Sequence, residues 1–284
     1  MDKTPVNPPS KKLITENSFT FSVIGRIESC ARYHYEAPRQ PVYARAGAFL
    51  RWEQAIYADC AVDLAGFDRI CLIWVFDQNK HRNWRSKVRV PVPAERDHYS
   101  VFATRSPYRP NPIGLSVVEL KEVAPDGLLL GPCDLLNGTA ILDVKPYIPE
   151  IDAFPDSRAG WRDRIEKAQY QVEFSAAAIK QMEFIFQHSA LDLQNFCQVQ
   201  LQHRPDDKSR KRLEVDSCSA QAGSWILHCR TWKIFFQIDE EAKHIYVSYV
   251  AGNYSASELL PGAEDPYSDK ELHRLFLQQN WTDK

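Results

Sequence analysis

The sequence predicts a mainly β protein, with an all-β barrel or sandwich followed by a smaller α+β domain. Short runs rich in β-branched and aromatic residues, separated by Gly, Pro and Asp, fill residues 19–150. No long helical period interrupts these runs before about residue 162. Apolar residues then recur at three- and four-residue spacing from Ser175 to His188, which is typical of an amphipathic helix.

The expected elements follow in chain order. Residues 1–18 predict a flexible leader, and residues 19–160 form the first domain. The second domain, residues 161–252, has the helix after Ser175, a second helix at 191–201 and two strand-like runs at 223–238 and 243–250. Residues 253–284 form an acidic tail in which LHRLFLQQNW could be a terminal helix. In the first domain, strands are expected at residues 19–27, 47–52, 69–76, 87–93, 99–104, 115–123, 128–133 and 141–148.

Composition limits the class of protein. The chain has 284 residues, of which 44% are hydrophobic and 25% charged, as in soluble globular proteins. Its net charge of −2 neither favours nor excludes a nucleic-acid partner, because the distribution of charge matters more than the total. The seven cysteines are scattered without a CxxC pair, which indicates reduced thiols and no zinc site.

Export and membrane insertion are not expected. The leader is rich in Pro, Asn, Ser and Lys and lacks the apolar core of a signal peptide. No run approaches the roughly 20 apolar residues that a membrane-spanning helix needs. The sequence therefore predicts a cytoplasmic protein with no membrane partner.

The strongest candidate site is RSPYRPNPIG, residues 105–114. Its three prolines restrict the backbone and remove donors, so the loop is preorganised and its carbonyls could accept hydrogen bonds from a ligand. Arg105 and Arg109 offer planar guanidinium groups that suit carboxylate or phosphate. Asn111 can donate and accept in one plane, as an adenine edge requires. The alternative is a rigid barrel turn with solvated arginines.

Two further stretches combine prolines with polar side chains. EAPRQP contains Arg39 and Gln40. ILDVKPYIP places Asp143, Lys145 and Tyr147 on one face of a strand, because alternate residues share a face. Charged residues in an otherwise apolar strand indicate a site, and the alternative is a structural ion pair at the strand end.

Two basic segments are compatible with an RNA partner. Residues 80–89 contain five Lys or Arg with a histidine and a tryptophan between them, and residues 204–212 contain five more. Phosphates favour such patches, and an aromatic side chain can stack on an unpaired base. The alternative is two solvated basic loops. The candidate RNA contacts are Arg82, Arg85, Lys87, Arg204, Lys208 and Arg210.

Several other chemistries lack support. No GxGxxG follows a strand, and no thiol has the neighbours of a catalytic nucleophile. The Asp, Glu and His residues show no metal-ligand spacing, so no metal is expected.

Together, the stretches PRQP, FDRICLIWVF, FATRSPYRPNPIG and LNGTAILDVKPYIP resemble the hallmark stretches of the TrmO (YaeB or TsaA-like) family. These are tRNA adenosine N6-methyltransferases that use S-adenosylmethionine. The resemblance is strong over residues 19–150 and continues more weakly to about 240. It implies an N-terminal TsaA-like β-barrel, a homodimer with the cofactor near the subunit interface, and a C-terminal domain that touches tRNA. The implied substrate is N6 of threonylcarbamoyladenosine at position 37, in the anticodon loop of threonine tRNA.

The resemblance also implies roles for individual residues. The reaction site would be lined by Asn111, Asp143, Lys145 and Tyr147, with Arg109 on the threonylcarbamoyl carboxylate. Relatives carry His-Gln where this chain has Asp77 and Gln78, and only Arg204 and Pro205 remain of the usual C-terminal DPRP motif. The implied cofactor contacts are Arg39, Gln40, Pro41, Asp77, Gln78, Arg105, Leu115 and Asp134.

The implied mechanism is mainly alignment of the two reactants. Asn111 or a loop carbonyl could localise the N6 lone pair, and Asp143 could accept the proton. Two other functions stay open, namely a non-catalytic RNA-binding barrel and a methyltransferase that acts on a different adenosine or a small molecule.

Overall fold

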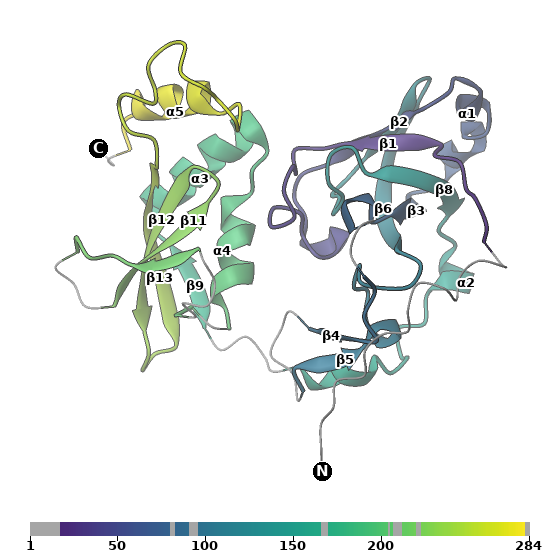
Figure 1. The fold of residues 1–284 in the computed structure, drawn as a ribbon, viewed down its shortest axis with the longest axis horizontal. Coiled ribbons are helices and arrows are strands. Elements are labelled where there is room, and N and C mark those ends of the chain that lie inside the picture. Colours follow the sequence, from purple (N-terminus) through teal and green to yellow (C-terminus); the bar gives the residue numbers. More distant parts are fainter. Residues whose placement is uncertain are drawn as a thin grey trace. The chain divides into compact units, whose positions relative to one another are not determined.

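The protein divides into two compact units, residues 1–165 and 166–284 (Figure 1). The structure, a computed structural model, describes residues 18–79, 83–90, 96–165, 170–203, 205–206, 212–219 and 223–281. Within this described part, no helix has both the length and the apolar character required to cross a bilayer. The first unit is a closed barrel and the second combines a sheet with helices, which confirms the predicted mainly β fold class.

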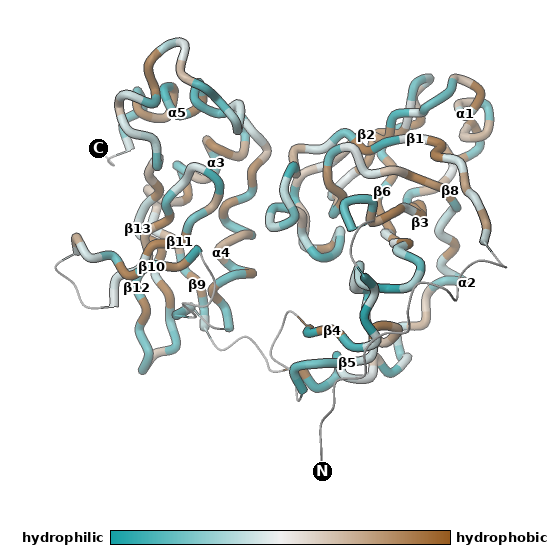
Figure 2. Tube along the Cα trace, in the orientation of Figure 1, coloured by the Kyte–Doolittle hydropathy of each residue, from teal (hydrophilic) through white to brown (hydrophobic). Residues whose placement is uncertain are grey.

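The barrel has six strands in the order β1-β2-β7-β6-β3-β8, and all neighbours are antiparallel. Alternate residues point inward, as in β6, where buried and more exposed residues alternate from Ile113 to Leu120. Leu50, Leu72 and Ile141 are fully buried in the core that this alternation creates, and the barrel strands are correspondingly brown in Figure 2. The strands are β1 (Gly25–Glu28), β2 (Ala48–Trp52), β3 (Arg69–Val75), β6 (Ile113–Ala124), β7 (Gly127–Leu130) and β8 (Ala140–Pro146).

Two of the eight expected strands lie outside the barrel. β4 (Lys87–Arg89) and β5 (His98–Ser100) pair with each other in a separate two-stranded ribbon. Each has three residues, of which only the middle one, Val88 or Tyr99, is buried. The short helical turns of this unit are η2 (Pro41–Tyr43), α1 (Ile56–Asp59), η3 (Val62–Gly66), η4 (Asp77–Asn79), η5 (Val101–Ala103), α2 (Pro149–Asp152) and η6 (Gly160–Arg164).

The second unit has a five-stranded sheet in the order β10-β11-β12-β13-β9, in which β9 runs parallel to β13. Helices α3 and α4 lie on one side of this sheet (Figure 1). Ile234 and Val247 are fully buried. The strands are β9 (Gln171–Phe174), β10 (Leu213–Val215), β11 (Ser224–Cys229), β12 (Trp232–Asp239) and β13 (His244–Gly252).

Both predicted helices are present and capped. α3 (Ala176–Ser189) follows Ser175, whose hydroxyl accepts a hydrogen bond from the Ala178 amide at 2.9 Å, as expected of an N-cap. α4 (Leu193–Leu201) is capped by Asp192, which accepts from the Asn195 amide at 3.0 Å.

Residues 253–281, expected as an acidic tail, fold within the second unit. α5 (Lys270–Leu277) buries His273 and Phe276, and the His273 ring stacks on Trp232 with 3.8 Å between ring centroids. Asp269 accepts hydrogen bonds from Thr231 and Tyr254.

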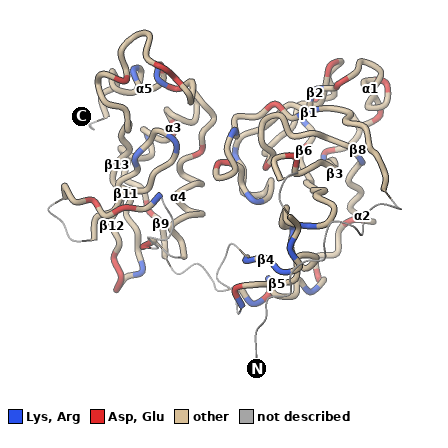
Figure 3. The backbone as a smooth tube through the Cα atoms, viewed as in Figure 1, with Lys and Arg blue, Asp and Glu red and all other residues tan. Residues whose placement is uncertain are grey.

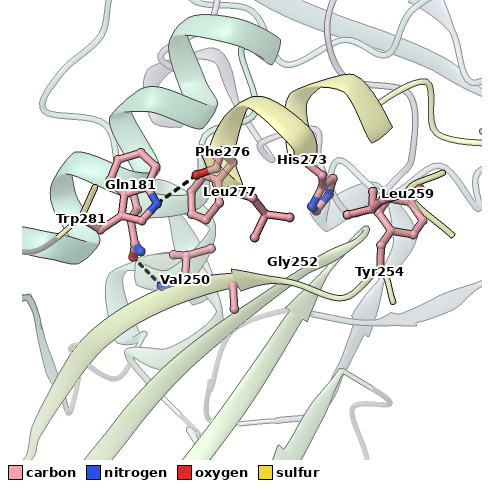
Figure 4. Close-up of a pocket in the computed structure, with 10 residues that line it drawn as sticks. Gln181, Val250, Gly252, Tyr254, Leu259, His273, Phe276, Leu277 and Trp281 are labelled. Carbon is pink, nitrogen blue, oxygen red and sulfur yellow. Dashed lines mark hydrogen bonds between the residues drawn. The ribbon is translucent and has the colours of Figure 1, made fainter. Parts of the chain in front are cut away.

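A pocket of about 230 Å³ lies between α5 and β13, with His273 and Gly252 among its lining residues (Figure 4). It belongs to the second unit and contains none of the predicted site residues.

Candidate active site

The loop at 104–112 leads into β6 and is held by hydrogen bonds of its own. The Thr104 hydroxyl donates to the Val101 carbonyl at 2.8 Å and accepts from the Ser106 amide at 3.2 Å. The carbonyl oxygens of Tyr108 and Pro112 accept from the amides of Arg85 and Phe76, at 2.9 and 2.8 Å. The loop is therefore well supported, but the expectation that its carbonyls are open to a ligand is wrong for these two oxygens.

The PRQP stretch lies against this loop. The Arg105 guanidinium donates to the Gln40 side-chain oxygen, although 65 positions separate the two residues in the sequence. The Gln40 amide nitrogen in turn donates to the Arg39 carbonyl, and Pro41 begins η2. The barrel thus joins two of the stretches that sequence analysis selected.

Ser116 brings Trp74 and Asp134 together. The Trp74 indole donates to the Ser116 hydroxyl at 3.1 Å, and that hydroxyl lies close enough to the Asp134 carboxylate to lower its pKa. Ser116 is only 1% exposed. Trp74 lies directly over Gly114, where an added Cβ would be 2.3 Å from the indole. Gly114 is therefore required by the close approach of the indole to the backbone.

Asp134 is the most perturbed carboxylate of this site. Burial raises its pKa to about 6, while the Ser116 hydroxyl and the nearby Arg105 guanidinium act in the opposite direction. Its Oδ1 atom is buried and has no hydrogen-bond partner within the described part of the chain. A buried acceptor without a partner is costly in a folded protein, so this atom is suited to a donor group of a ligand.

Asp143 lies on the other face of the barrel wall from Ser116. In the register, Ile73 of β3 pairs with both Leu115 and Asp143, so these three residues share the outer face. The register of β8 shifts at Leu142, and this bulge turns Asp143 outward although Ile141 points into the core.

The outward residues of β8 form an ion pair. Lys145 Nζ lies 2.9 Å from Asp143 Oδ2, and the Asp143 carboxylate raises the pKa of Lys145. Asp143 Oδ1 accepts from the Val144 amide at 2.9 Å. Tyr147 follows the strand, with its amide donating to the Arg69 carbonyl. The ion-pair alternative considered from the sequence is thus present, and it leaves the carboxylate 46% exposed and accessible to a substrate.

The remaining predicted residues lie in the loop and in the turn that follows β3. Asp77 and Gln78 lie in η4 directly after β3. Asn111 is exposed, and its main-chain carbonyl accepts from the Ile113 amide. Arg109 uses Nη1 to donate to the Thr104 carbonyl at 3.0 Å and lies over the Phe102 ring. One of its nitrogens is therefore committed to the loop.

Only part of the predicted RNA contacts can be placed. Arg85 and Lys87 are exposed at the start of the ribbon, and the Arg85 guanidinium lies 4.8 Å from the Tyr108 ring centroid. No three His, Cys, Asp or Glu side chains gather into a possible metal site in the parts of the chain that the structure describes. Arg82, Arg204, Lys208 and Arg210 lie outside the described residues.

Sequence analysis did not select Trp74 or Ser116. Ser116 was visible as a polar residue in the apolar run LSVVEL, but its partners depend on strand register. Trp74 lies in the strand expected at 69–76, and only the pairing of β3 with β6 shows that it covers Gly114.

Comparison with known proteins gives consistent results. The family model of the tRNA-methyltransferase O N-terminal domain matches residues 26–153. The tRNA (adenine(37)-N6)-methyltransferase of Escherichia coli (strain K12) is 38% identical over 172 residues, which are 58% of this chain and 73% of the relative. The putative S-adenosylmethionine-dependent methyltransferase RcsF of Pseudomonas aeruginosa is 36% identical over 166 residues, or 58% and 69%. The crystal structure of TrmO from Pseudomonas aeruginosa superposes with a TM-score of 0.58 at 27% identity, covering 83% of this chain and 99% of that one.

Proposed function

We propose, since the chain belongs to the TrmO family of tRNA methyltransferases, that it transfers a methyl group from S-adenosylmethionine to N6 of threonylcarbamoyladenosine at position 37 of threonine tRNA. The observation that carries this proposal is the convergence of Gln40, Arg105 and Asp134 at one end of the barrel. The family resemblance supports the choice of nucleoside and of tRNA. It also supports a homodimer that acts in the cytoplasm.

The residues at the barrel end fit the cofactor. S-adenosylmethionine, when bound, supplies an electrophilic methyl group on a sulfonium sulfur, and the sulfur–methyl bond breaks as the methyl–N6 bond forms. Asp134 Oδ1, buried and without a partner among the described residues, would accept a hydrogen bond from an amino or hydroxyl group. Arg105 and Gln40 would hold the neighbouring polar groups. The other proposed cofactor contacts are Arg39, Pro41, Asp77, Gln78 and Leu115.

The outer face of the barrel wall would serve the nucleoside. N6 loses a proton as it gains the methyl group, and Asp143, oriented by Lys145, would accept that proton. Asn111 would hydrogen-bond the adenine edge. Arg109 would offer its remaining nitrogens to the threonylcarbamoyl carboxylate, with Tyr147 beside the base.

The decisive experiment uses two forms of threonine tRNA, with and without the threonylcarbamoyl group on adenosine 37. Each is incubated with the purified chain and S-adenosylmethionine, and its nucleosides are analysed by mass spectrometry. We expect N6-methylated threonylcarbamoyladenosine from the first form and no methylated product from the second. Methylation of unmodified adenosine would favour a different substrate. Cofactor binding in calorimetry without any methylation would favour a non-catalytic RNA-binding barrel.

The chain offers a matched control for the proposed base. Glu119 pairs with Lys121 two residues away on β6, as Asp143 does with Lys145 on β8. Asp143→Asn should lower the turnover rate well beyond threefold, whereas Glu119→Gln should leave it unchanged. An Asp143→Asn rate within about threefold of the parent would remove Asp143 from the chemistry.

A further inference from the structure

A column of stacked side chains joins the ribbon to the segment before the end of the first unit. The Arg96 guanidinium lies 5.3 Å from the Tyr99 ring centroid, and Tyr99 stacks on Trp161 at 5.0 Å with an interplanar angle of 28°. The Arg162 guanidinium lies 5.9 Å from the Trp161 ring. Cation–π contacts of this kind restrain two arginines that would otherwise be mobile.

The column belongs to a strongly basic surface. We call residues 83–90, 96–103 and 160–164 the basic platform; they contain six Lys or Arg against two Asp. The register pairs Lys87 with Ser100 and Arg89 with His98, which places both cations on the exposed face of the ribbon. Figure 3 shows the resulting blue positions at β4 and β5.

Five cations of the basic platform carry the inference. None of the five forms an ion pair with a carboxylate of the described residues, although Asp97 and Asp163 belong to the platform. Exposed cations without a carboxylate partner bind polyanions such as nucleic acids, because this binding releases the counterions that are condensed on the phosphates. These five are Arg85, Lys87, Arg89, Arg96 and Arg162.

The basic platform is also attached to the loop of the candidate active site. The Trp161 indole donates to the Ala103 carbonyl at 2.7 Å, directly before the loop begins at Thr104. The Arg85 amide donates to the Tyr108 carbonyl at 2.9 Å, within the loop itself. Two hydrogen bonds thus fix the spacing between the cations and the loop.

We infer that the basic platform binds the phosphate backbone of the RNA substrate, with Arg96 and Arg162 as phosphate contacts and Trp161 as a positioning residue. This inference rests on the proposed function, because it assumes that the polyanion is RNA. Phosphate contacts position a nucleic acid without reading its sequence. Arginines already ordered by stacking lose less conformational entropy on binding than unrestrained ones.

The test compares two double variants that remove the same charge. Arg96→Gln/Arg162→Gln alters the platform, and Arg26→Gln/Arg69→Gln alters exposed arginines on barrel strands. Affinity for threonine tRNA is measured between 50 and 200 mM salt, and S-adenosylmethionine affinity is measured by calorimetry. We expect the slope of log affinity against log salt to become shallower by about 1.5 in the platform variant only, because each lost phosphate contact removes about 0.7 to 0.9. Cofactor affinity should not change in either variant.

The inference would be overturned if the platform variant kept the salt dependence of the parent. It would also be overturned if both double variants lost the same amount of tRNA affinity. Binding of tRNA no tighter than binding of polyglutamate would overturn it as well, and would point to an acidic protein partner. Since this measurement needs no methylation, its failure is distinguishable from failure of the proposed reaction.

Trp161→Phe separates positioning from binding. It keeps an aromatic ring on Tyr99 and removes the donor to Ala103. We expect tRNA affinity and KM close to the parent and a kcat lowered several-fold. An unchanged kcat would overturn the positioning role.

Discussion

Replacing Asp134 by asparagine should make the protein without its cofactor more stable at neutral pH and, at the same time, weaken S-adenosylmethionine binding. Asp134 is half-buried, and its Oδ1 atom is buried without a hydrogen-bond partner among the described residues, with Ser116 nearby. Asparagine has nearly the same shape as aspartate. The substitution therefore removes a buried charge with little change in packing.

The size of the effect follows from the pKa of Asp134, which burial raises from 3.8 to about 6. Between pH 4 and pH 6 the Asp134 carboxyl is therefore protonated to a greater extent in the folded state than in the unfolded state. Stability therefore falls as pH rises through that window and levels off above it. The destabilisation reaches about 3 kcal/mol at pH 7.5. Since the asparagine amide nitrogen is itself buried without a partner, we expect a net gain of about 1 to 3 kcal/mol.

The assay is urea unfolding of both proteins at pH 7.5 and pH 5, with calorimetry of S-adenosylmethionine at each pH. The gain in stability should be smaller by about 1.4 kcal/mol at pH 5, where the parent carboxyl is mostly protonated. Cofactor affinity of the parent should drop below about pH 6, and that of the variant should be low throughout. Asp143→Asn, at an exposed position, is the control and should change stability little. A less stable Asp134→Asn, or a gain independent of pH, would refute the reasoning.

Three other substitutions or conditions test the same structure. Gly114→Ala places a Cβ 2.3 Å from the Trp74 indole and should cost about 1 to 3 kcal/mol in urea unfolding, and an unchanged midpoint would contradict that contact. Gln40→Ala removes the acceptor of Arg105 and should weaken S-adenosylmethionine binding about tenfold in calorimetry with the unfolding temperature retained. Burial lowers the pKa of His273 to about 4, so stability of the second unit should be full above pH 6.5 and decrease as pH falls toward 4. His273→Asn should flatten this profile in urea unfolding, and an equal slope would remove His273 as its cause.

Local patterns in the sequence were enough for most of the fold. Strand runs such as 69–76 and 115–123 have inward residues at every second position, so their existence and buried face follow from the chain itself. The cap at Ser175 was predictable because a hydroxyl before an amphipathic period satisfies an open amide. The candidate loops were predictable because prolines, arginines and an amide rarely gather in a turn without a role.

Features that depend on pairing between distant strands were not predictable. The runs at 87–93 and 99–104 resemble barrel strands, yet the strands that form there, β4 and β5, pair with each other outside the barrel, and each of them buries only its middle side chain. The surroundings of Asp134 arise from two strands, β3 and β6, which bring Trp74 and Ser116 to a carboxylate that follows β7. The hydrogen-bond donors around a carboxylate come from distant strands, so they cannot be predicted from the local sequence.

The bulge at Leu142 keeps the Asp143 carboxylate out of the barrel core. Without it, Asp143 would share the face of Ile141 and enter the core, where an ionised carboxylate would be costly. With it, Asp143 and Leu115 lie on the outer face of the wall, whereas Ser116 lies on the inner face, near Asp134. The bulge therefore places the proposed proton acceptor on the same face as Leu115, one of the proposed cofactor contacts, and leaves its carboxylate accessible to solvent.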